Sequence, residues 1–306
     1  MPPAVDSAAI AERLLSAWEA GADQPADLAG MLDIDAAYAV QMAVLARHRA
    51  AGRTQSGWKI GQTSAAMRAA NGETTAALGF VLAAGGLENG ARLALEGAEN
   101  RFLEPELAFV MGRDLRGADV TPEQVRAAVG HVAPAFELVT RHGRFADRAL
   151  QRALNLAHGG YVLGERTTGC PDATALDALH VTVTCNGAKE VEARGGEVND
   201  NPLASTAWLA QRLAPLDEGL SAGQVILTGS YSPLLPLRPG QRWVAAFAGL
   251  GEVAPRWSEF DFAPPKWSIG GGFRVSLNDD EGLNLRIDAG FGDDTWGLYV
   301  GVAEAF

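Results

Sequence analysis

Hydrophobic residues recur every three to four positions in two segments near the start of the chain. In residues 6–21, an apolar stripe follows the N-cap candidate Asp6, and Gly21 closes the segment. Residues 33–52 repeat this arrangement, from an acidic start to a closing glycine. Because this spacing gathers apolar side chains on one side of a helix, both segments are predicted to be amphipathic helices.

From residue 57 onward, short apolar runs alternate with glycines and other turn residues, a texture typical of β-strands. The strand candidates are 99–112, 133–139, 179–187 and 223–230, and the further helix candidates are 121–132 and 201–216. Helices come first and a strand-rich region follows, so an α+β fold is predicted. We expect an N-terminal helical or cap region (1–85), a strand-rich core (86–257) and an appended tail (258–306).

The tail differs in texture from the rest of the chain. Residues 266–306 contain three alternating, strand-like runs that are separated by the acidic turns "NDDEG" and "GDD". No other part of the sequence repeats this pattern. Three β-strands joined by short turns are therefore predicted after the core.

Composition narrows the class of protein. The chain has 306 residues, of which 47% are hydrophobic and 20% charged, and this predicts a soluble globular protein. The net charge of -12 argues against a nucleic-acid partner. Cys170 and Cys185 are too few for a disulfide scaffold and lack zinc-type spacing. Without a signal-peptide pattern or an apolar run of about 18 residues, we expect a cytoplasmic protein with no membrane contact.

Three glutamates stand inside apolar strand candidates. Glu104 and Glu106 lie two positions apart and so share one face of a strand, while Glu137 lies in the next strand candidate. Three carboxylates with free coordination positions would suit Mg²⁺ or Mn²⁺. The pattern alone leaves two alternatives open, an exposed face at a sheet edge or ion pairs with the arginines Arg101, Arg113 and Arg141.

Three further residues are candidates for chemistry. Lys59, between Trp58 and Ile60, could hold a substrate carboxylate or move protons, or could equally lie extended along a strand edge. Ser230 ends a strand next to a glycine, where backbone N–H groups and a hydroxyl can bind an anion, although such a sequence is more often a simple turn. His158 is interpreted as a packed or exposed histidine rather than a base.

Taken together, these segments resemble the fumarylacetoacetate hydrolase superfamily, in the branch of 2-oxopent-4-enoate hydratases and 4-oxalocrotonate decarboxylases. The resemblance covers roughly residues 8–257, and the matching segments occur in family order. They are "AGRTQSGWKIGQTSAAM", "EPELAFVMGRDLRG", "APAFELV", "NLAHGGYVLG", "STAWLAQRLAPLDEGLSAGQVILTGSYSPLLPLRPG" and "VAAFAGLGEVAPRW". The tail instead resembles the last strands of a surface-antigen-type outer-membrane barrel. We interpret the tail as a fused segment, or as an ordinary appended hairpin, and not as a sign of membrane function.

The family resemblance implies a mixed β core that binds one divalent metal, Mg²⁺ or Mn²⁺, through Glu104, Glu106 and Glu137. It implies that Lys59 is catalytic or orients the substrate, and we expect Ser230 to contact the substrate as well. The implied activity is a lyase of aromatic meta-cleavage catabolism, a hydratase that converts a 2-hydroxy-2,4-dienoate into a 4-hydroxy-2-oxo acid. Decarboxylase or C–C hydrolase chemistry on a related 2-oxo acid is the alternative.

Two departures from the family pattern affect the expected acid–base chemistry. Hydratases of this branch carry an aspartate shortly before the motif that matches residues 79–81, where this chain has Ala77 and no acid nearby except Glu73. A second aspartate, three residues after the third metal-binding glutamate, is replaced by Thr140. A non-catalytic partner subunit is therefore a third hypothesis. We expect a homo-oligomer, or a complex with a partner decarboxylase or hydratase.

Overall fold

The structure is a computed structural model that describes most of the chain. The described residues are 6–93, 100–141, 145, 147–253, 256–257, 269–278, 283–292 and 295–304. The chain divides into two compact units, Met1–Glu259 and Phe260–Phe306. The candidate chemistry lies entirely in the first unit.

Helices form in the four segments where the hydrophobic periodicity predicts them, and short helices outside those segments accompany them. They are α1 (Ser7–Glu19), α2 (Ile34–Ala50), α3 (Ala65–Ala70), α4 (Pro122–Ala128), α5 (Arg148–Ala153), α6 (Ala173–Asp177), α7 (Gly195–Val198) and α8 (Pro202–Leu213), with 3-10 turns η1 (Ala26–Leu28), η2 (Ala83–Gly85), η4 (Asn155–Ala157) and η5 (Ala214–Leu216). The side chain of Asp6 accepts hydrogen bonds from the first turn of α1, and Asp33 does the same for α2. Both N-terminal helices are thus confirmed, with acidic caps that satisfy their first N–H groups.

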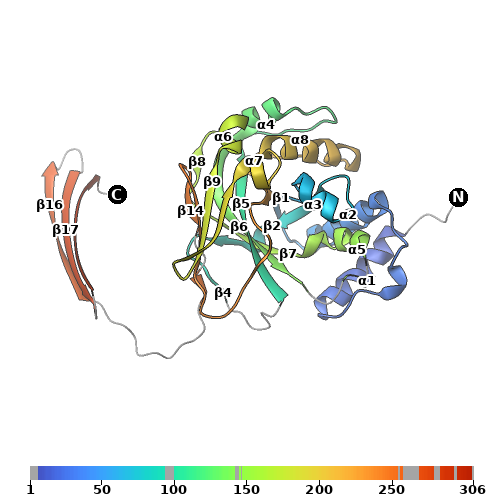
Figure 1. The fold of residues 1–306 in the computed structure, drawn as a ribbon, viewed down its shortest axis with the longest axis horizontal. Coiled ribbons are helices and arrows are strands. Elements are labelled where there is room, and N and C mark those ends of the chain that lie inside the picture. Colours follow the sequence, from blue (N-terminus) through green and yellow to red (C-terminus); the bar gives the residue numbers. More distant parts are fainter. Residues whose placement is uncertain are drawn as a thin grey trace. The chain divides into compact units, whose positions relative to one another are not determined.

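A nine-stranded mixed sheet forms the centre of the first unit (Figure 1). Its strands are β1 (Gln55–Gly61), β2 (Ala77–Leu82), β3 (Gly86–Glu88), β5 (Arg101–Met111), β6 (Val129–Thr140), β7 (His158–Leu163), β8 (Thr167–Thr168), β11 (Val225–Ser230) and β12 (Leu235–Pro236). The order is β2-β1-β11-β5-β6-β7-β3, with β12 beside β5 and β8 beside β6. The pairs β1–β11 and β3–β7 are parallel, and the other pairs are antiparallel.

The remaining strands form smaller sheets. A four-stranded sheet has the order β10 (Ala188–Arg194), β9 (His180–Cys185), β13 (Trp243–Phe247) and β14 (Gly251–Val253), and β4 (Arg92–Leu93) pairs with β15 (Arg256–Trp257). A tight hairpin turn joins β9 to β10 at Asn186 and Gly187, both with positive φ, and Asn-Gly is a sequence that favours such turns. In the second unit, β16 (Ile269–Asn278), β17 (Leu283–Gly292) and β18 (Thr295–Glu304) pair antiparallel, as the alternation predicts.

One predicted boundary is wrong. The helix expected over 121–132 ends at Ala128, and Val129 already begins β6, which runs on to Thr140. The β-branched residues of this segment continue the pairing with β5 instead of extending the helix. The α+β fold class is confirmed, whereas the functional division at residues 85 and 257 stays a prediction. In the part of the chain that the structure describes, no helix has the length and apolar character needed to cross a membrane.

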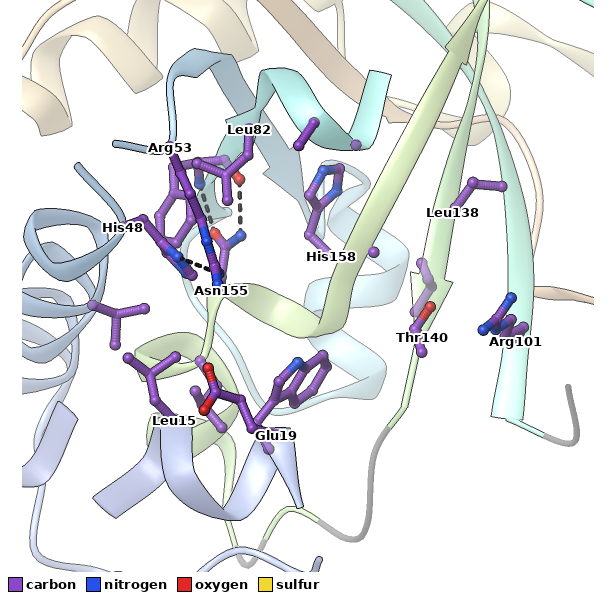
Figure 2. Close-up of a pocket in the computed structure, with 18 of the residues that line it drawn as sticks. Leu15, Glu19, His48, Arg53, Leu82, Arg101, Leu138, Thr140, Asn155 and His158 are labelled. Atoms are coloured by element: carbon purple, nitrogen blue, oxygen red, sulfur yellow. Dashed lines mark hydrogen bonds between the residues drawn. The ribbon is translucent and has the colours of Figure 1, made fainter. Parts of the chain in front are cut away.

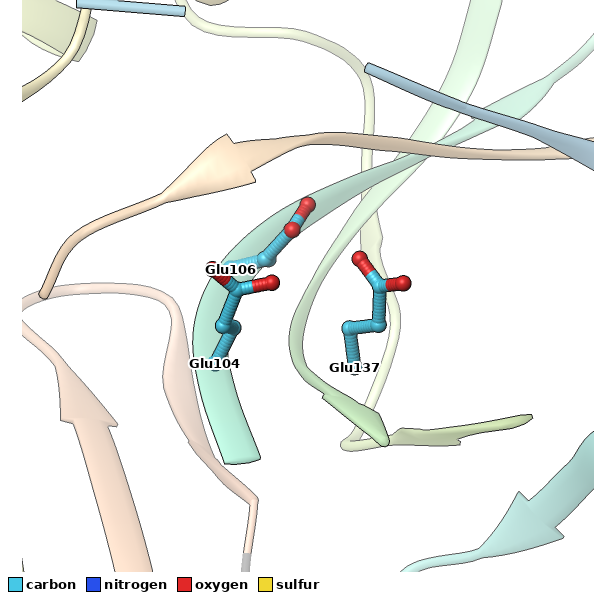
Figure 3. Close-up of side chains that lie close together, drawn as sticks. All are labelled: Glu104, Glu106 and Glu137. Atoms are coloured by element: carbon cyan, nitrogen blue, oxygen red, sulfur yellow. The ribbon is translucent and has the colours of Figure 1, made fainter. Parts of the chain in front are cut away.

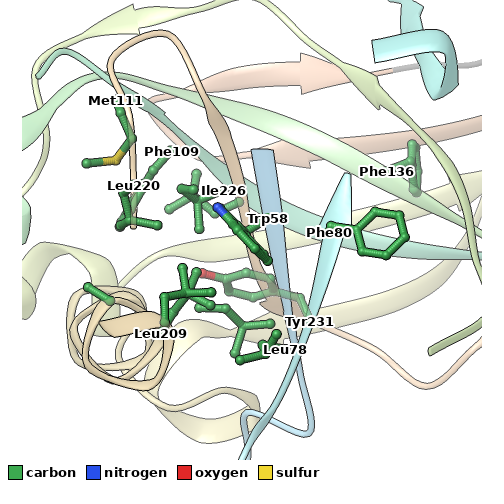
Figure 4. Packing of buried hydrophobic residues seen from close by; sticks show 14 of the residues in the cluster. Trp58, Leu78, Phe80, Phe109, Met111, Phe136, Leu209, Leu220, Ile226 and Tyr231 are labelled. Atoms are coloured by element: carbon green, nitrogen blue, oxygen red, sulfur yellow. The ribbon is translucent and has the colours of Figure 1, made fainter. Parts of the chain in front are cut away.

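The two faces of the large sheet are packed differently. One face carries large side chains such as Trp58, Phe109 and Ile226, which belong to the main core shared with the helices (Figure 4). The opposite face carries mostly smaller residues, Val81, Ala108, Val110, Ala135, Val225 and Leu227, which form a second buried cluster together with Tyr161. Small side chains leave space on that face. Lys59 and the three glutamates point into this space.

A close backbone approach between β1 and β11 provides a test of this sheet. Gly57 pairs with Val225, and a Cβ built on Gly57 would lie 1.8 Å from the Val225 carbonyl oxygen. We expect Gly57→Ala to lower the free energy of unfolding by about 3 kcal/mol or more, because the backbones must separate. The measurement is chemical denaturation followed by circular dichroism.

Gly61→Ala in the same strand is the matched control. Its Cβ would meet the Cδ1 atom of Leu156 at 3.4 Å, an ordinary contact. The free energy of unfolding should therefore change by less than about 1 kcal/mol. Equal stability of the two variants would contradict the parallel pairing at Gly57.

Candidate active site

Three glutamates from two neighbouring strands meet on the small-residue face of the sheet (Figure 3). The register of β5 and β6 pairs Glu104 directly with Glu137, and Glu106 follows two residues later on the same face. One oxygen from each of the three carboxylates lies within 4.8 Å of the others. Glu106 and Glu137 are 1% and 0% exposed, and Glu104 is half-buried. We call this group the carboxylate cluster and this face of the sheet the glutamate face.

The electrostatics of the carboxylate cluster call for a cation. Burial and the charge of Glu137 raise the pKa of Glu104 to about 7. Burial and the two neighbouring carboxylates raise the pKa of Glu106 well above its usual range. The Oε2 atom of Glu137 is buried and has no hydrogen-bond partner among the described residues. Oxygen-only donors with one unsatisfied buried atom fit a hard divalent cation such as Mg²⁺ or Mn²⁺.

Lys59 reaches the carboxylate cluster from β1. Its neighbours Trp58 and Ile60 are fully buried in the main core, so the alternation of the strand directs Lys59 to the glutamate face. The Nζ atom donates a hydrogen bond to Oε1 of Glu137 at 2.6 Å, and the lysine is only 4% exposed. Burial lowers the pKa of Lys59, but the glutamates outweigh it and raise the pKa overall. Lys59 is therefore a buried ammonium group, and the strand-edge alternative is wrong.

His158 also contacts the carboxylate cluster. Its Nδ1 atom lies 2.9 Å from Oε1 of Glu137. Burial raises the pKa of Glu137, but Lys59 and His158 together lower it to about 2. An ionised carboxylate can only accept, so Nδ1 of His158 must donate. Two donors thus occupy Oε1 and leave Oε2 for a cation. The interpretation of His158 as a packed or exposed side chain missed this contact, which exists only because β7 pairs with β6.

The end of β11 holds the second carboxylate in place. The backbone N–H of Gly229 donates to Oε2 of Glu106 at 2.8 Å, so the anion bound at this strand end is the protein's own carboxylate. Gly229 has a φ of 113°, and a Cβ there would lie 2.2 Å from Oγ1 of Thr63. Ser230 pairs opposite Glu106, and its hydroxyl donates to the Ser232 carbonyl at 2.8 Å. Contact between Ser230 and a substrate stays a prediction.

A small cavity of about 30 Å³ surrounds the carboxylate cluster. It is lined by Ile60, Gly61, Gln62, Thr63, Ser64, Met67, Val198, Ser230 and the three glutamates. Arg68 fixes the segment over the cavity, because its guanidinium donates to the carbonyls of Gln62 and Thr63 at 3.1 and 3.0 Å. The same group pairs with Asp200 at 2.8 Å. No local pattern could indicate the contact between Arg68 and Asp200, because these residues are 132 positions apart.

A larger cavity of about 670 Å³ lies nearby (Figure 2). Residues of α1, α2 and β2 and the ends of β5 and β6 line it, mostly with apolar side chains. His158 stands in its wall, but none of the three glutamates does. The candidate site is therefore defined by the chemistry of the carboxylate cluster and not by the size of the cavity.

The positions of the two missing aspartates offer no replacement acid. Ala77 is buried in β2 opposite Gly61, and Thr140 ends β6. Glu73, the remaining acid near Ala77, forms a salt bridge with Arg152 at 2.7 Å. Among the described residues that line the small cavity, the carboxylate cluster supplies the only acidic groups.

Comparison with known proteins identifies the family of this chain. Residues 73–256 match the family model described as fumarylacetoacetate (FAA) hydrolase C-terminal. The chain is 33% identical over 234 residues to 2-oxo-hept-4-ene-1,7-dioate hydratase of Escherichia coli, covering 74% of this chain and 87% of that protein. It is 31% identical over 232 residues to 2-hydroxyhexa-2,4-dienoate hydratase of Comamonas testosteroni, covering 74% and 88%.

A solved structure is also similar. The 4-oxalocrotonate decarboxylase from Pseudomonas putida G7, complexed with magnesium and adipate, superposes with a TM-score of 0.75 at 27% identity. The match covers 82% of this chain and 97% of the decarboxylase. The chain belongs to the fumarylacetoacetate hydrolase family, and the predicted core fold is confirmed. The family match ends before the tail, so the tail resemblance stays a prediction.

The contact between His158 and Glu137 predicts an effect on metal binding. We expect His158→Ala to weaken the binding of Mn²⁺ by about 10- to 100-fold, because Glu137 loses one of the two donors that orient it. Isothermal titration calorimetry measures the dissociation constant. His158→Gln, which keeps an N–H donor, should lose less.

His131→Ala is the control for removal of a histidine from the sheet. His131 lies on β6, where it pairs with Val110 of β5. It is six residues away from Glu137 along the strand. Its loss should leave the dissociation constant unchanged within about twofold. If His158→Ala binds Mn²⁺ as tightly as His131→Ala, His158 does not orient Glu137.

Proposed function

We propose that this chain is a metal-dependent hydro-lyase that adds water to a 2-hydroxy-2,4-dienoate and releases a 4-hydroxy-2-oxo acid. The observation that carries the proposal is the buried carboxylate cluster with Lys59 bonded to Glu137. The relatives supply the substrate class, because they are named as hydratases of 2-oxo-4-enoates or of their dienol forms. Such reactions belong to the catabolism of aromatic compounds.

The proposed metal ligands are Glu104, Glu106 and Glu137, and the proposed ion is Mg²⁺ or Mn²⁺. The unpartnered Oε2 atom of Glu137 and the raised pKa values of the other two glutamates support this assignment. The similar decarboxylase was solved with magnesium and also with calcium. A bound divalent cation would act as a Lewis acid that stabilises negative charge on the 2-oxo group of the substrate.

The chain's own residues then have separate roles. Lys59 holds a fixed positive charge beside the cluster, where it can attract the substrate carboxylate and stabilise charge on the C2 oxygen. His158 and Lys59 together keep Glu137 ionised and oriented. Ser230 and the loop of Gln62 and Thr63 line the cavity in which the substrate must lie.

The reaction balances with water as the only other reactant. Protonation of the dienol at C5 and loss of the enol proton give a conjugated enone. Water adds its oxygen at C4, and a proton returns to C3, so the product is the 4-hydroxy-2-oxo acid. The aspartates expected for these proton transfers are absent at Ala77 and Thr140. We therefore expect the charged groups at the site, above all Lys59, to stabilise the negative charge that develops on the 2-oxo end of the substrate.

Two features favour a second candidate, decarboxylation of a related 2-oxo diacid. The similar solved structure is a decarboxylase, and the loss of the aspartates removes groups expected to serve water addition. Decarboxylation uses the same electron-accepting 2-oxo group but needs no activated water. A non-catalytic subunit remains the third hypothesis. Assembly as a homo-oligomer and a cytoplasmic location are also predictions.

Turnover assays separate these hypotheses. With Mg²⁺ and 2-hydroxypenta-2,4-dienoate, we expect loss of the dienol absorbance and formation of 4-hydroxy-2-oxopentanoate. Release of CO₂ from a 2-oxo-3-enedioate, without turnover of the pentadienoate, would assign the decarboxylase activity instead. Tight binding of metal with no turnover of either compound would favour the non-catalytic subunit.

Substitution of one glutamate tests the metal assignment. We expect Glu106→Gln to lower metal-dependent turnover by about 100-fold or more, because the amide removes a negative charge from the cluster. Circular dichroism should show an intact fold, since the amide oxygen can still accept from Gly229. Glu190→Gln, on an exposed part of β10, is the control. Unchanged turnover by Glu106→Gln would contradict the assignment of Glu106 as a metal ligand.

A further inference from the structure

The glutamate face continues beyond the carboxylate cluster toward the ends of β5 and β6. Phe102 lies two residues before Glu104, and Val139 lies two residues after Glu137. The register pairs Phe102 with Val139, just as it pairs Glu104 with Glu137. Side chains two positions apart share a face of a strand. The apolar pair of Phe102 and Val139 is therefore the neighbour of the carboxylate cluster on the glutamate face.

Arg141 follows this apolar pair. It lies two residues after Val139, and its backbone N–H donates to the Asn100 carbonyl at 2.9 Å, which continues the pairing of the two chain segments. The guanidinium carbon lies 5.1 Å from the centre of the Phe102 ring. Its charge also lowers the pKa of Glu104, against the dominant effect of burial. Arg141 thus places an exposed cation on the same side as the carboxylate cluster.

Charge neutrality at the cluster does not require Arg141. The charges of the three carboxylates are matched by Lys59 together with one divalent cation, so the guanidinium is an additional positive charge on this face. The other arginine at this strand end, Arg101, pairs with Thr140 and therefore alternates to the opposite face. Arg101 and the apolar pair Phe102 and Val139 all line the larger cavity.

The distance between the Arg141 guanidinium and the carboxylate cluster, where the cation would bind, indicates the length of the ligand. Because the guanidinium lies over Phe102, two residues from Glu104, it is roughly 7 Å along the strand from the carboxylate cluster. An extended dicarboxylate of about six or seven carbons spans a comparable length. Its apolar middle would lie against Phe102 and Val139.

We propose that Arg141 binds the second carboxylate of a dicarboxylate substrate whose 2-oxo end lies at the carboxylate cluster. This inference rests on the proposed function and narrows its substrate class from 2-oxo acids in general to diacids. The planar guanidinium suits the role because it can hold a carboxylate through two parallel hydrogen bonds. Arg141 is then a specificity-determining residue at the distal end of the site.

Two saturated ligands of equal length test the proposal without any chemistry. 2-Oxoadipate carries a carboxylate at C6, whereas 2-oxohexanoate ends in a methyl group. In the presence of Mg²⁺, we expect the full-length protein to bind 2-oxoadipate about 10- to 100-fold more tightly, as measured by isothermal titration calorimetry. Arg141→Ala should remove this preference and leave the dissociation constant of 2-oxohexanoate within about twofold.

Two more variants refine the test. Arg141→Lys keeps the charge without the planar geometry, so part of the preference should remain. Arg113→Ala removes an exposed arginine just beyond the opposite end of β5 and should keep the full preference. In turnover assays of a dienol diacid, Arg141→Ala should raise KM by about 10- to 100-fold with little change in kcat.

The outcomes distinguish this inference from the proposed function. Equal binding of the two ligands by the wild-type protein, or a preference that survives in Arg141→Ala, overturns the role of Arg141. In either case, turnover of 2-hydroxypenta-2,4-dienoate would still support the hydratase. If no 2-oxo acid binds in the presence of Mg²⁺ and no dienoate is turned over, the proposed function fails, and this inference fails with it.

Discussion

The structure depends on the crowding of three carboxylates on one buried face of a sheet. Removing carboxylates from water and bringing them together is unfavourable for folding, as the raised pKa values of Glu104 and Glu106 show. Lys59 compensates one charge through its 2.6 Å contact with Glu137. The remaining charge makes a divalent cation the natural counterpart of the site. The same repulsion that opposes folding therefore favours the binding of a cation at the cluster.

The sheet maintains this arrangement by separating its two faces. Large side chains such as Trp58 and Phe109 pack into the main core on one side. Small residues such as Ala108 and Ala135 occupy the other side and leave room for long polar side chains. Since strand residues alternate between faces, the packing that stabilises the fold also orients Lys59 toward the carboxylates. Stability and function are thus coupled through the register of the strands.

The surroundings of Glu137 explain how the site can remain organised without the expected aspartates. Lys59 and His158 both donate to Oε1, which fixes the direction of Oε2. The backbone N–H of Gly229 holds Glu106 in a similar way. These contacts support a preorganised site for charge that develops on the substrate. What differs from the family pattern is therefore the pair of aspartates and not the three carboxylates that we propose as metal ligands.

The sequence by itself determined the two N-terminal helices, the α+β class and the shared face of Glu104 and Glu106, because these follow from local periodicity. The strand pattern also offered Glu137 as a third carboxylate of a possible metal site, and the family resemblance made that site the expected one and added Lys59 to it. Only the tertiary structure decided that Lys59 and His158 meet on one oxygen of Glu137, since strand order and register bring together residues separated by 78 and 21 positions. The predicted helix end at residue 132 is wrong for the same reason, since the helix ends at Ala128. Pairing with β5 is a long-range interaction, and it outweighed the local helical pattern.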